Sequence, residues 1–301
     1  MRIGITGATG FLGRYITRQL AACDHQLRLW YRPQSDRSDF ESIAHMLEWI
    51  PGELGQAEAE RELVQGCDTI VHAALWRPDK STFQGREGDI VEFVERNIMG
   101  SLRLIAAARA AGVPRFIFIS TCAVHDQILS DRPLDEKHPL WPKSHYGAHK
   151  AAIEKFVHSY GLGEGYDICA LRPTGIYGVD HPIQQSKWYD LVRAVIAGQT
   201  VDCRGGGKEV HAADVAKSVE RLLTVDGLAG QSYNCYDMYV SQYDIATIAQ
   251  ELSGSAATIR GQVTAPKHQI ETGKLRALGV QFGGRALLET TIAQLVTAAS
   301  P

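Results

Sequence analysis

Thr121, Tyr146 and Lys150 have the residue types that a proton-transfer site needs. Tyr146 and Lys150 lie four positions apart in HYGAHK, which puts both side chains on one face of a helix. A phenol can exchange a proton with a substrate oxygen while a hydride moves between the substrate carbon and a nicotinamide. The hydroxyl of Thr121 would hold the same oxygen through a hydrogen bond. Because Tyr-x-x-x-Lys also arises by chance in helices, an ordinary surface pair is the alternative.

This chemistry makes a demand on the pKa of Tyr146. Free tyrosine titrates near 10, so a phenol that acts near neutrality needs a pKa lower by roughly 3, which corresponds to about 4 kcal/mol. The ammonium group of Lys150 and the positive charge of an oxidised nicotinamide would both stabilise the phenolate. We therefore expect the pKa of Tyr146 to be lowered.

A glycine-rich loop near the start of the chain is typical of a dinucleotide site. The segment TGATGFLG at 6–13 follows the apolar run RIGIT and precedes a helical pattern. Its first glycine allows a tight turn, the second lets the backbone approach a pyrophosphate, and the third lets the helix pack on the strand. The N–H groups at the helix N-terminus would face the phosphates. The expected cofactor contacts are Gly7, Thr9, Gly10, Phe11, Leu12 and Gly13.

The end of the second predicted strand, at 26–31, distinguishes the two nicotinamide dinucleotides. Sites for NAD(H) usually carry an acidic residue there, about twenty positions after the glycines, which binds the adenosine ribose. This chain has Tyr31 and Arg32 instead, and the first carboxylate beyond them is Asp36. Arg32 could pair with a 2′-phosphate, as could Arg14. The sequence favours NADP(H), with NAD(H) as the alternative.

Alternating strands and helices would position these residues. Short apolar runs predict strands at 2–6, 26–31, 46–50, 69–74, 115–120 and 167–173, with amphipathic stretches between them. Parallel strands covered by helices on both faces give an α/β fold, a Rossmann-type doubly wound sheet. After Pro173 the alternation breaks. We expect a dinucleotide-binding domain at 1–172 and a smaller, mainly substrate-binding lobe at 173–301, with a helix near 213–224 that packs back on the first domain.

The composition excludes several classes of protein. Hydrophobic residues make up 45% of the 301 residues and charged residues 22%, as in ordinary globular proteins, and a net charge of −3 gives no reason to expect nucleic acid or a membrane surface as partner. The chain opens MRIGITGATG, unlike a signal peptide, and has no apolar run of about 18 residues that could span a membrane. Six widely spaced cysteines without a CxxC pair indicate free thiols. We expect a cytoplasmic protein.

Five motifs in order resemble the short-chain dehydrogenase/reductase superfamily, and more narrowly its extended branch, the NAD(P)-dependent epimerase/dehydratase family. They are TGATGFLG, Asn97 in NIMGS, STCAV, YGAHK and LRPTGIYG, and the similarity runs from residue 1 to at least HAADVA at 211–216. The resemblance implies Thr121, Tyr146 and Lys150 as the catalytic triad. It also implies that Asn97 supports the lysine through a water molecule.

The same resemblance implies further contacts and a homodimer. Members of the family pair the helix after Asn97 and the helix that carries Tyr146 across a two-fold axis, and the 94–111 stretch has small and apolar residues on more than one face, as a helix buried twice needs. The implied dinucleotide contacts are Gly52, Glu53 and Leu54 at the adenine, Ala73 and Ala74 at the ribose, and Pro173 to Ile176 at the nicotinamide.

Three residues near these motifs are candidates for the substrate pocket. Thr174 follows the LRP strand, and Cys122 follows Thr121. Since no base is fixed beside Cys122 in the sequence, we interpret it as a buried or pocket-lining thiol rather than a nucleophile. Trp76 either lines the mouth of the substrate site or covers the core. His145 and His149 have the spacing of a zinc-binding helix, but Tyr146 stands where that motif needs a glutamate, so we expect no metal.

Departures from the family pattern bear on the reaction. Thr121-Cys122-Ala123 lacks the acidic pair of the dehydratases. The segment GGGKEVHAAD has Lys208 but no arginine where nucleotide-sugar epimerases hold a diphosphate, and the second arginine of those enzymes, in R-x-G-D, has no match at Arg260. The sequence favours reversible hydride transfer between a nicotinamide and a carbonyl or secondary alcohol. The alternatives are a nucleotide-sugar 4-epimerase and a regulator that binds dinucleotide without turnover.

Overall fold

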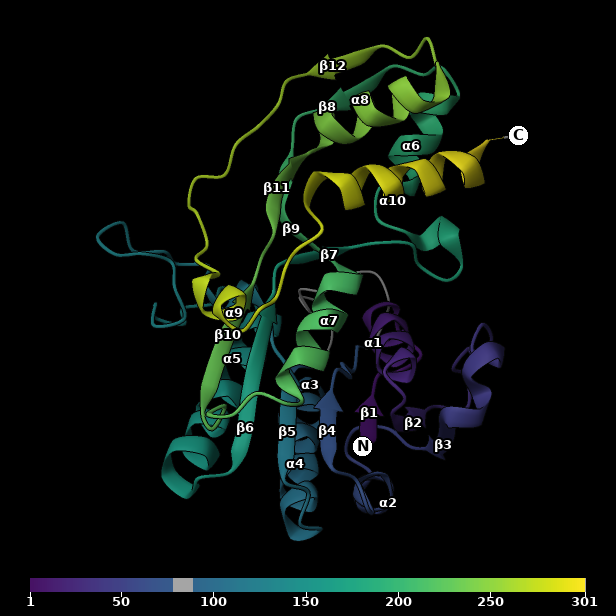
Figure 1. The fold of residues 1–301 in the computed structure, drawn as a ribbon. Coiled ribbons are helices and arrows are strands. Elements are labelled where there is room, and N and C mark those ends of the chain that lie inside the picture. Colours follow the sequence, from purple (N-terminus) through teal and green to yellow (C-terminus); the bar gives the residue numbers. More distant parts are fainter. Residues whose placement is uncertain (78–88, 301) are drawn as a thin grey trace. The chain divides into compact units, whose positions relative to one another are not determined.

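A computed structural model describes residues 1–77 and 89–300 of the protein, and the chain divides into two units (Figure 1). Unit 1 comprises Met1–Pro173, Val215–Cys235 and Glu271–Val280. Unit 2 comprises Thr174–Asp214, Tyr236–Ile270 and the chain from Gln281 onward. The chain therefore leaves unit 1 after Pro173 and returns to it twice.

Seven parallel strands form the central sheet of unit 1 (Figure 1). Their order is β10-β6-β5-β4-β1-β2-β3, and every neighbouring pair is parallel. The strand order reverses direction between β1 and β4, which is where ligands bind in sheets of this type. The predicted Rossmann-type α/β fold is confirmed. The strands are β1 (Arg2–Thr6), β2 (Gln26–Tyr31), β3 (Leu47–Pro51), β4 (Thr69–His72), β5 (Arg115–Ile119), β6 (Asp167–Pro173) and β10 (Gln231–Cys235).

Six of these strands follow the apolar runs of the sequence, and β10 does not. Its sequence, QSYNC, is mostly polar, yet all of its residues after Gln231 are buried. The buried polar side chains have partners from distant parts of the chain: Ser232 donates to Glu154, and Asn234 donates to the carbonyl oxygen of Glu271. Hydrogen bonds of this kind allow a polar strand to lie in a core, although Asn234 Oδ1 has no hydrogen-bond partner among the described residues.

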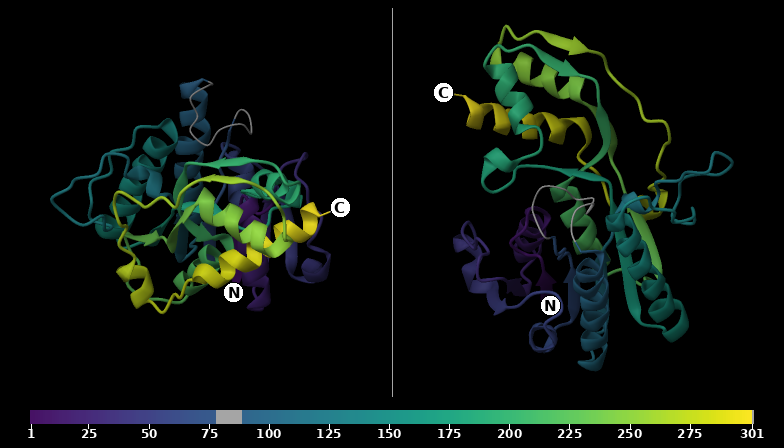
Figure 2. Two further views of the ribbon diagram at one scale, coloured as in Figure 1. Left: turned by 90° about the horizontal axis from the view of Figure 1, so that it is seen from above. Right: turned by 180° about the vertical axis from the view of Figure 1, so that it is seen from behind.

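Helices cover both faces of the sheet. α1 (Phe11–Ala22) and α7 (Ala212–Leu222) lie on the face toward the viewer in Figure 1. The view from behind in Figure 2 shows α4 (Gly100–Ala110) and α5 (His145–His158) over the other face, where they share a buried core with α2 (Ala57–Val64) and with β4, β5 and β6. The other helical segments of unit 1 are η1 (Glu41–Met46), α3 (Ile90–Val94), the π-helical η2 (Glu95–Met99), η3 (Cys122–Val124), the π-helical η4 (Ser159–Gly163) and α9 (Gly273–Ala277).

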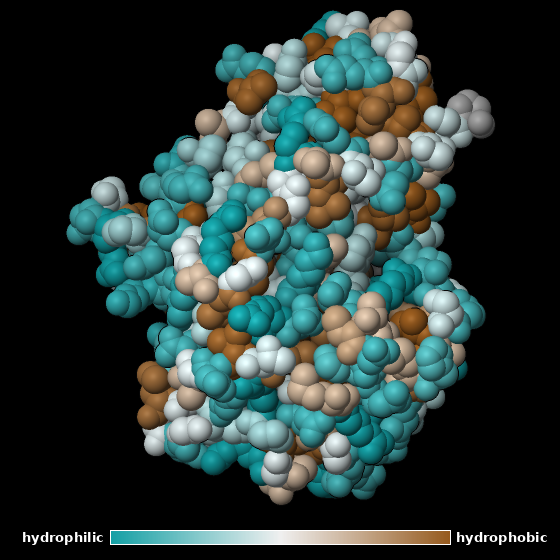
Figure 3. Space-filling view, in the orientation of Figure 1, coloured by the Kyte–Doolittle hydropathy of each residue, from teal (hydrophilic) through white to brown (hydrophobic). Residues whose placement is uncertain are grey.

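Unit 2 contains two small sheets and three longer helices. Its own core lies between α6, α8 and α10, where Val192, Ile245 and Ile292 are fully buried. On the face shown in Figure 3, an apolar patch lies over the helices of this unit. The elements are β7 (Gly175–Tyr177), η5 (Ile183–Gln185), α6 (Tyr189–Ile196), β8 (Val201–Cys203), β9 (Gly206–His211), β11 (Met238–Ser241), α8 (Gln242–Ser253), β12 (Ile259–Gly261) and α10 (Gly284–Ala299). Across residues 1–77 and 89–300, each helix is too short or too polar to cross a membrane.

Candidate active site

The glycine loop joins β1 to α1 with the close packing that a dinucleotide cradle requires. Gly7 has φ +75°, and a Cβ there would lie 2.9 Å from the carbonyl carbon of Ala73. A Cβ on Gly13 would lie 2.0 Å from the carbonyl oxygen of Gly7, so only glycine lets α1 come this near to the loop. Gly10 is the N-cap residue of α1 and, within the described residues, no side chain caps that end. The first N–H groups of α1 are therefore suited to bind a phosphate.

Two further predicted cofactor segments follow the neighbouring strands. Ala73 and Ala74 come directly after β4, and both of their N–H groups are held by Thr6: one donates to its carbonyl oxygen (3.2 Å) and the other to its Oγ1 (3.1 Å). Glu53 and Leu54 follow β3, where Leu54 is buried and the Glu53 carboxylate lies 3.5 Å from Arg96. The carboxyl ends of parallel strands meet at one edge, so these segments and the glycine loop share the edge where dinucleotides bind.

The two arginines considered for a 2′-phosphate differ in their surroundings. Arg32 follows β2 and is exposed. Arg14 is buried, donates to the carbonyl oxygens of Ser38 (2.7 Å) and Asp36 (2.8 Å), and lies 4.9 Å from the ring centroid of Phe40. Arg14 therefore holds the loop after β2, and the interpretation of Arg14 as a phosphate ligand does not fit these contacts. Arg32 keeps its place as the candidate.

The predicted catalytic side chains converge at the carboxyl end of β5. Thr121 follows this strand, and its hydroxyl is hydrogen-bonded to the phenol of Tyr146 in the first turn of α5. Ser144 caps α5, since its Oγ accepts from the N–H of Gly147 at 3.1 Å. Lys150 is buried one turn later, where its Nζ donates to the carbonyl oxygen of Ile119 at 2.7 Å. The helix start is thus fixed at the point that places the phenol beside the hydroxyl.

The pKa of Tyr146 shifts in the direction opposite to the one we expect from the sequence. Burial raises the pKa of this phenol, while the hydrogen bond with Thr121 and the guanidinium of Arg77 act to lower it. Burial also lowers the pKa of Lys150, to about 7, although the carboxylate of Glu154 acts to raise it. For both side chains, the cost of placing a charge in the interior outweighs the neighbouring groups that act in the opposite direction. In this state Tyr146 is a protonated phenol near neutral pH, which is the form that donates.

Asn97 lies in the π-helical turn η2, and its amide is engaged on both sides. Its Oδ1 accepts from the N–H of Trp76 at 2.9 Å, and its Nδ2 donates to the carbonyl oxygens of Trp76 (3.0 Å) and Phe93 (3.1 Å). Asn97 thus fixes the backbone at Trp76, whose partly buried side chain packs against the core of α2, α4 and α5. The water-mediated support of Lys150 by Asn97 stays a prediction.

A buried histidine, which the sequence analysis did not identify, connects Asn97 with the cofactor loop. The hydroxyl of Ser101 donates its single proton to the carbonyl oxygen of Asn97 at 2.5 Å. Its oxygen must therefore accept the hydrogen bond from His72 Nε2–H at 2.8 Å. His72 Nδ1 then accepts from the hydroxyl of Thr6 at 2.7 Å. Burial lowers the pKa of His72 to about 3, in agreement with a neutral ring that donates at one nitrogen and accepts at the other.

The predicted nicotinamide and substrate residues lie at the ends of three elements. Cys122 follows Thr121, and its thiol donates to the carbonyl oxygen of Arg172 at 3.0 Å. Burial raises the pKa of Cys122 to about 12, so the thiol stays neutral and is a poor nucleophile. Pro173 is the last residue of β6. Thr174 and Ile176 belong to unit 2, where Ile176 pairs with Val210 of β9.

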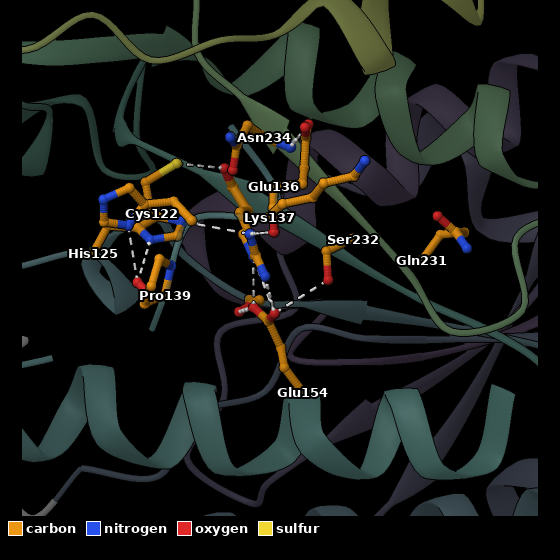
Figure 4. A network of polar contacts seen from close by, with 12 residues as sticks. Cys122, His125, Glu136, Lys137, Pro139, Glu154, Gln231, Ser232 and Asn234 are labelled. Carbon is orange, nitrogen blue, oxygen red and sulfur yellow. Dashed lines mark hydrogen bonds and ion pairs between the residues drawn. The ribbon is translucent and has the colours of Figure 1, made fainter. Parts of the chain in front are cut away.

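The sequence analysis also missed a buried ion pair that involves Glu154, which Figure 4 shows within a network of polar contacts. Glu154 on α5 and Arg172 on β6 are both fully buried and joined by three hydrogen bonds of 2.5–3.0 Å. The signal was present in the sequence, because Arg172 interrupts an apolar run, DICALRP, and a buried arginine needs an anionic partner. Glu154 stands one turn after Lys150 on the same face of the helix.

The chain is similar to known enzymes of one family. The family model described as "NAD dependent epimerase/dehydratase family" matches residues 3–235. A 4-hydroxy-2-methyl-3-oxo-4-farnesyl-3,4-dihydroquinoline-1-oxide ketoreductase of Stigmatella aurantiaca is 31% identical over 198 residues, which are 64% of this chain and 55% of that protein. A UDP-glucose 4-epimerase of Rhizobium meliloti is 28% identical over 192 residues, 62% of this chain and 55% of that protein. The matches thus span about half the length of these two relatives.

Solved structures extend the likeness over the whole chain. DesIV of Streptomyces venezuelae, a dTDP-glucose 4,6-dehydratase with NAD and TYD bound, is 25% identical with a TM-score of 0.78, and the match covers 99% of this chain and 96% of that one. The chain and this protein share the Rossmann-type α/β fold. The family resemblance inferred from the five motifs is confirmed.

Proposed function

Because the chain belongs to the NAD dependent epimerase/dehydratase family, we propose that it is an NAD(P)-dependent oxidoreductase acting on a carbonyl or secondary alcohol. The observation that carries this proposal is the hydrogen bond between Thr121 and Tyr146, one helical turn from the buried ammonium of Lys150. A nicotinamide, when bound, supplies or accepts the hydride. The chain's own residues must then hold the substrate oxygen and move its proton.

Each of the three side chains has a separate role in this mechanism. Tyr146, protonated near neutral pH, donates its proton to the carbonyl oxygen during reduction and takes it back during oxidation. Thr121 holds the same oxygen through its hydroxyl and thereby directs it toward the phenol. Lys150 places a positive charge near the phenolate that forms when the proton leaves, and this lowers the energy of that state.

The cofactor preference follows from the residues around the end of β2. The sequence offers no carboxylate at the end of this strand, where Tyr31 stands, and exposed Arg32 follows it. A second cation, the guanidinium of Arg37, lies 4.3 Å from the ring centroid of Tyr31. A 2′-phosphate would meet two arginines here, and we therefore favour NADP(H) over NAD(H).

The charge on β9 bears on the choice between reductase and epimerase. Glu209 of this strand is buried, and both of its carboxylate oxygens accept hydrogen bonds from Lys187 Nζ, at 2.5 and 2.6 Å. A Cβ on Gly207 would lie 2.4 Å from Glu209 Oε1, so the carboxylate fills the space beside this glycine. A neutralised lysine and a carboxylate are poor groups for a diphosphate. This favours a carbonyl substrate without one. A nucleotide-sugar 4-epimerase is the second candidate, in view of the relative of that activity.

A homodimer and a cytoplasmic location are further proposals. Apolar side chains are exposed along α3, η2 and α5, with exposed fractions of 71% for Val91, 38% for Met99 and 40% for Phe156. α4 and α5 lie side by side (Figure 2). A second copy of the chain packed on this surface would cover these side chains and bury the helices on a second face.

The decisive experiment combines the bound nucleotide with a substrate screen. We expect the purified protein to oxidise NADPH with members of a carbonyl panel, followed by absorbance. UDP-, dTDP- and GDP-sugars are tested in parallel by sugar-isomer analysis. Tightly retained NAD, interconversion of sugar epimers and no NADPH consumption on any carbonyl would replace the reductase by the epimerase.

A further inference from the structure

Four consecutive residues at the end of β5 are each tied down by a polar contact. The carbonyl oxygen of Ile119 accepts from Lys150, and the hydroxyl of Ser120 donates to Glu154 Oε1. The hydroxyl of Thr121 is hydrogen-bonded to Tyr146. The thiol of Cys122 donates to the backbone of the strand that carries Arg172. Three of these partners stand on α5, so the segment 119–122 is held against that helix residue by residue.

Glu154 is the point at which this segment, the helix and two more strands meet (Figure 4). Its carboxylate accepts from Ser120 at the end of β5, from Arg172 of β6 and, at 3.1 Å, from Ser232 of β10. Both members of the Glu154–Arg172 pair have exposed fractions of 1% or less. A fully paired buried carboxylate is rigid, because each alternative position would leave charged groups without partners.

The charge of Glu154 also acts on Lys150, one helical turn away. Burial acts to raise the pKa of Glu154, but the charge of Arg172 and the hydrogen bonds from Arg172, Ser120 and Ser232 together outweigh it, and the pKa lies below its ordinary value. The carboxylate is thus charged at neutral pH and stabilises the ammonium form of Lys150. Cys122 and Glu136 also act on Arg172. Lys150, Glu154 or Arg172 in turn act on His72, Cys122, His125, His149, His158 and Lys274.

We propose that Glu154 is a positioning residue of the active site, which with Arg172 fixes segment 119–122 against α5 and holds the ammonium of Lys150 at the carbonyl oxygen of Ile119, one helical turn from Tyr146. The inference rests on the proposed oxidoreductase function for its effect on turnover. Its effect on Lys150 does not depend on any substrate. The two can therefore be separated by experiment.

The test uses Glu154→Gln and the double variant Glu154→Gln/Arg172→Met, which leaves no unpaired guanidinium in the core. The control is Asp167→Asn, which breaks the Arg115–Asp167 ion pair (2.7 Å) between the same strands, β5 and β6, at their opposite ends. Lysine titration is followed by NMR of the 15N-labelled protein without substrate, with the Lys150 signal assigned through Lys150→Met. Turnover and NADPH affinity are measured on the same samples.

We expect Lys150 to titrate below its native value of about 7 in both Glu154 variants and to be unchanged in the control. The kcat should fall on the order of 100-fold, as expected for a misplacement of about 1 Å, with NADPH affinity within about threefold of the native protein. An unchanged Lys150 titration, or a kcat loss no larger than that of Asp167→Asn, overturns the inference. If the native protein turns over no substrate while the Lys150 titration still shifts, the proposed function fails and the assignment of Glu154 stands.

Discussion

The replacement Gly13→Ala is a direct test of the dinucleotide cradle. The added Cβ would lie 2.0 Å from the carbonyl oxygen of Gly7 and 2.8 Å from Cα of Ala8. Both neighbours are backbone atoms, so no side-chain rotation relieves the clash. A carbon needs roughly 3.0–3.5 Å to a backbone oxygen, and α1 must therefore move away from the loop by about 1 Å.

Two measurable losses follow from this movement. Overpacking of this kind costs about 1–3 kcal/mol, so the melting temperature of the protein without cofactor should fall by several degrees. A displacement of about 1 Å also separates the N-terminus of α1 from the phosphates, and we expect the dinucleotide affinity to fall on the order of 100-fold, or about 2.8 kcal/mol. Calorimetric titration with NADPH and NADH, together with thermal unfolding of the same protein, gives both numbers.

Two other glycines serve as controls for this prediction. A Cβ on Gly163 has no neighbour within 4 Å, so Gly163→Ala should change neither quantity. A Cβ on Gly10 would lie 3.3 Å from the carbonyl oxygen of Gly7, which is tight but tolerable. Gly10→Ala should therefore leave the fold intact. It should weaken dinucleotide binding alone, because the second glycine of the loop is the one that lets the backbone approach the pyrophosphate. If Gly13→Ala binds NADPH as tightly as Gly163→Ala and melts at the same temperature, the cradle is not where we place it.

Four further predictions concern the other parts of the site. Tyr146→Phe should lower kcat by roughly 10²–10⁴-fold while NADPH affinity changes little; full activity in steady-state assays would contradict the proton transfer. Lys150→Met should stabilise the protein, and most strongly below pH 7. The native lysine has a pKa of about 7 in the folded protein and near 10.4 in the unfolded chain, so the cost of burying its charge is complete below pH 7 and disappears as the pH rises toward 10. Thermal unfolding from pH 6 to 10 checks this dependence. Arg32→Glu should weaken NADPH binding at least about tenfold more than NADH binding, and equal losses would remove the NADP(H) assignment. Phe156→Glu should convert the proposed homodimer to a monomer in light scattering, with a native monomer at micromolar concentration as the contrary result.

The sequence predicted the fold wherever local pattern decides it. Continuous apolar runs located six strands of the main sheet to within two residues, since a strand buried on both faces needs apolar residues throughout. The polar strand β10 was not predicted because its stability depends on partners such as Glu154, which lie far away in the chain. The π-helical turn at Asn97 was not predicted for the same reason, because the side chain of Asn97 is hydrogen-bonded to the backbone of Trp76.

The site residues also differ in how far the sequence could predict them. The spacing of the glycines and of Tyr146 and Lys150 follows from local geometry, and the structure places these residues in the predicted elements. The sequence led us to expect a lowered pKa for Tyr146 because it shows which cations stand nearby in the chain. Burial is a property of the folded protein, and burial raises this pKa. The roles of His72 and Glu154 also became visible only through their buried contacts.

The raised pKa of Tyr146 indicates how one site could serve both directions of the reaction. With a reduced, neutral nicotinamide the phenol stays protonated, and it can only donate, which is what carbonyl reduction requires. With an oxidised nicotinamide bound, its positive charge would favour the phenolate of Tyr146, as the guanidinium of Arg77 already does in part. The phenol then becomes the base that alcohol oxidation requires. The charge of the bound cofactor, added to the ammonium of Lys150, would therefore set the protonation state of Tyr146 to suit each direction.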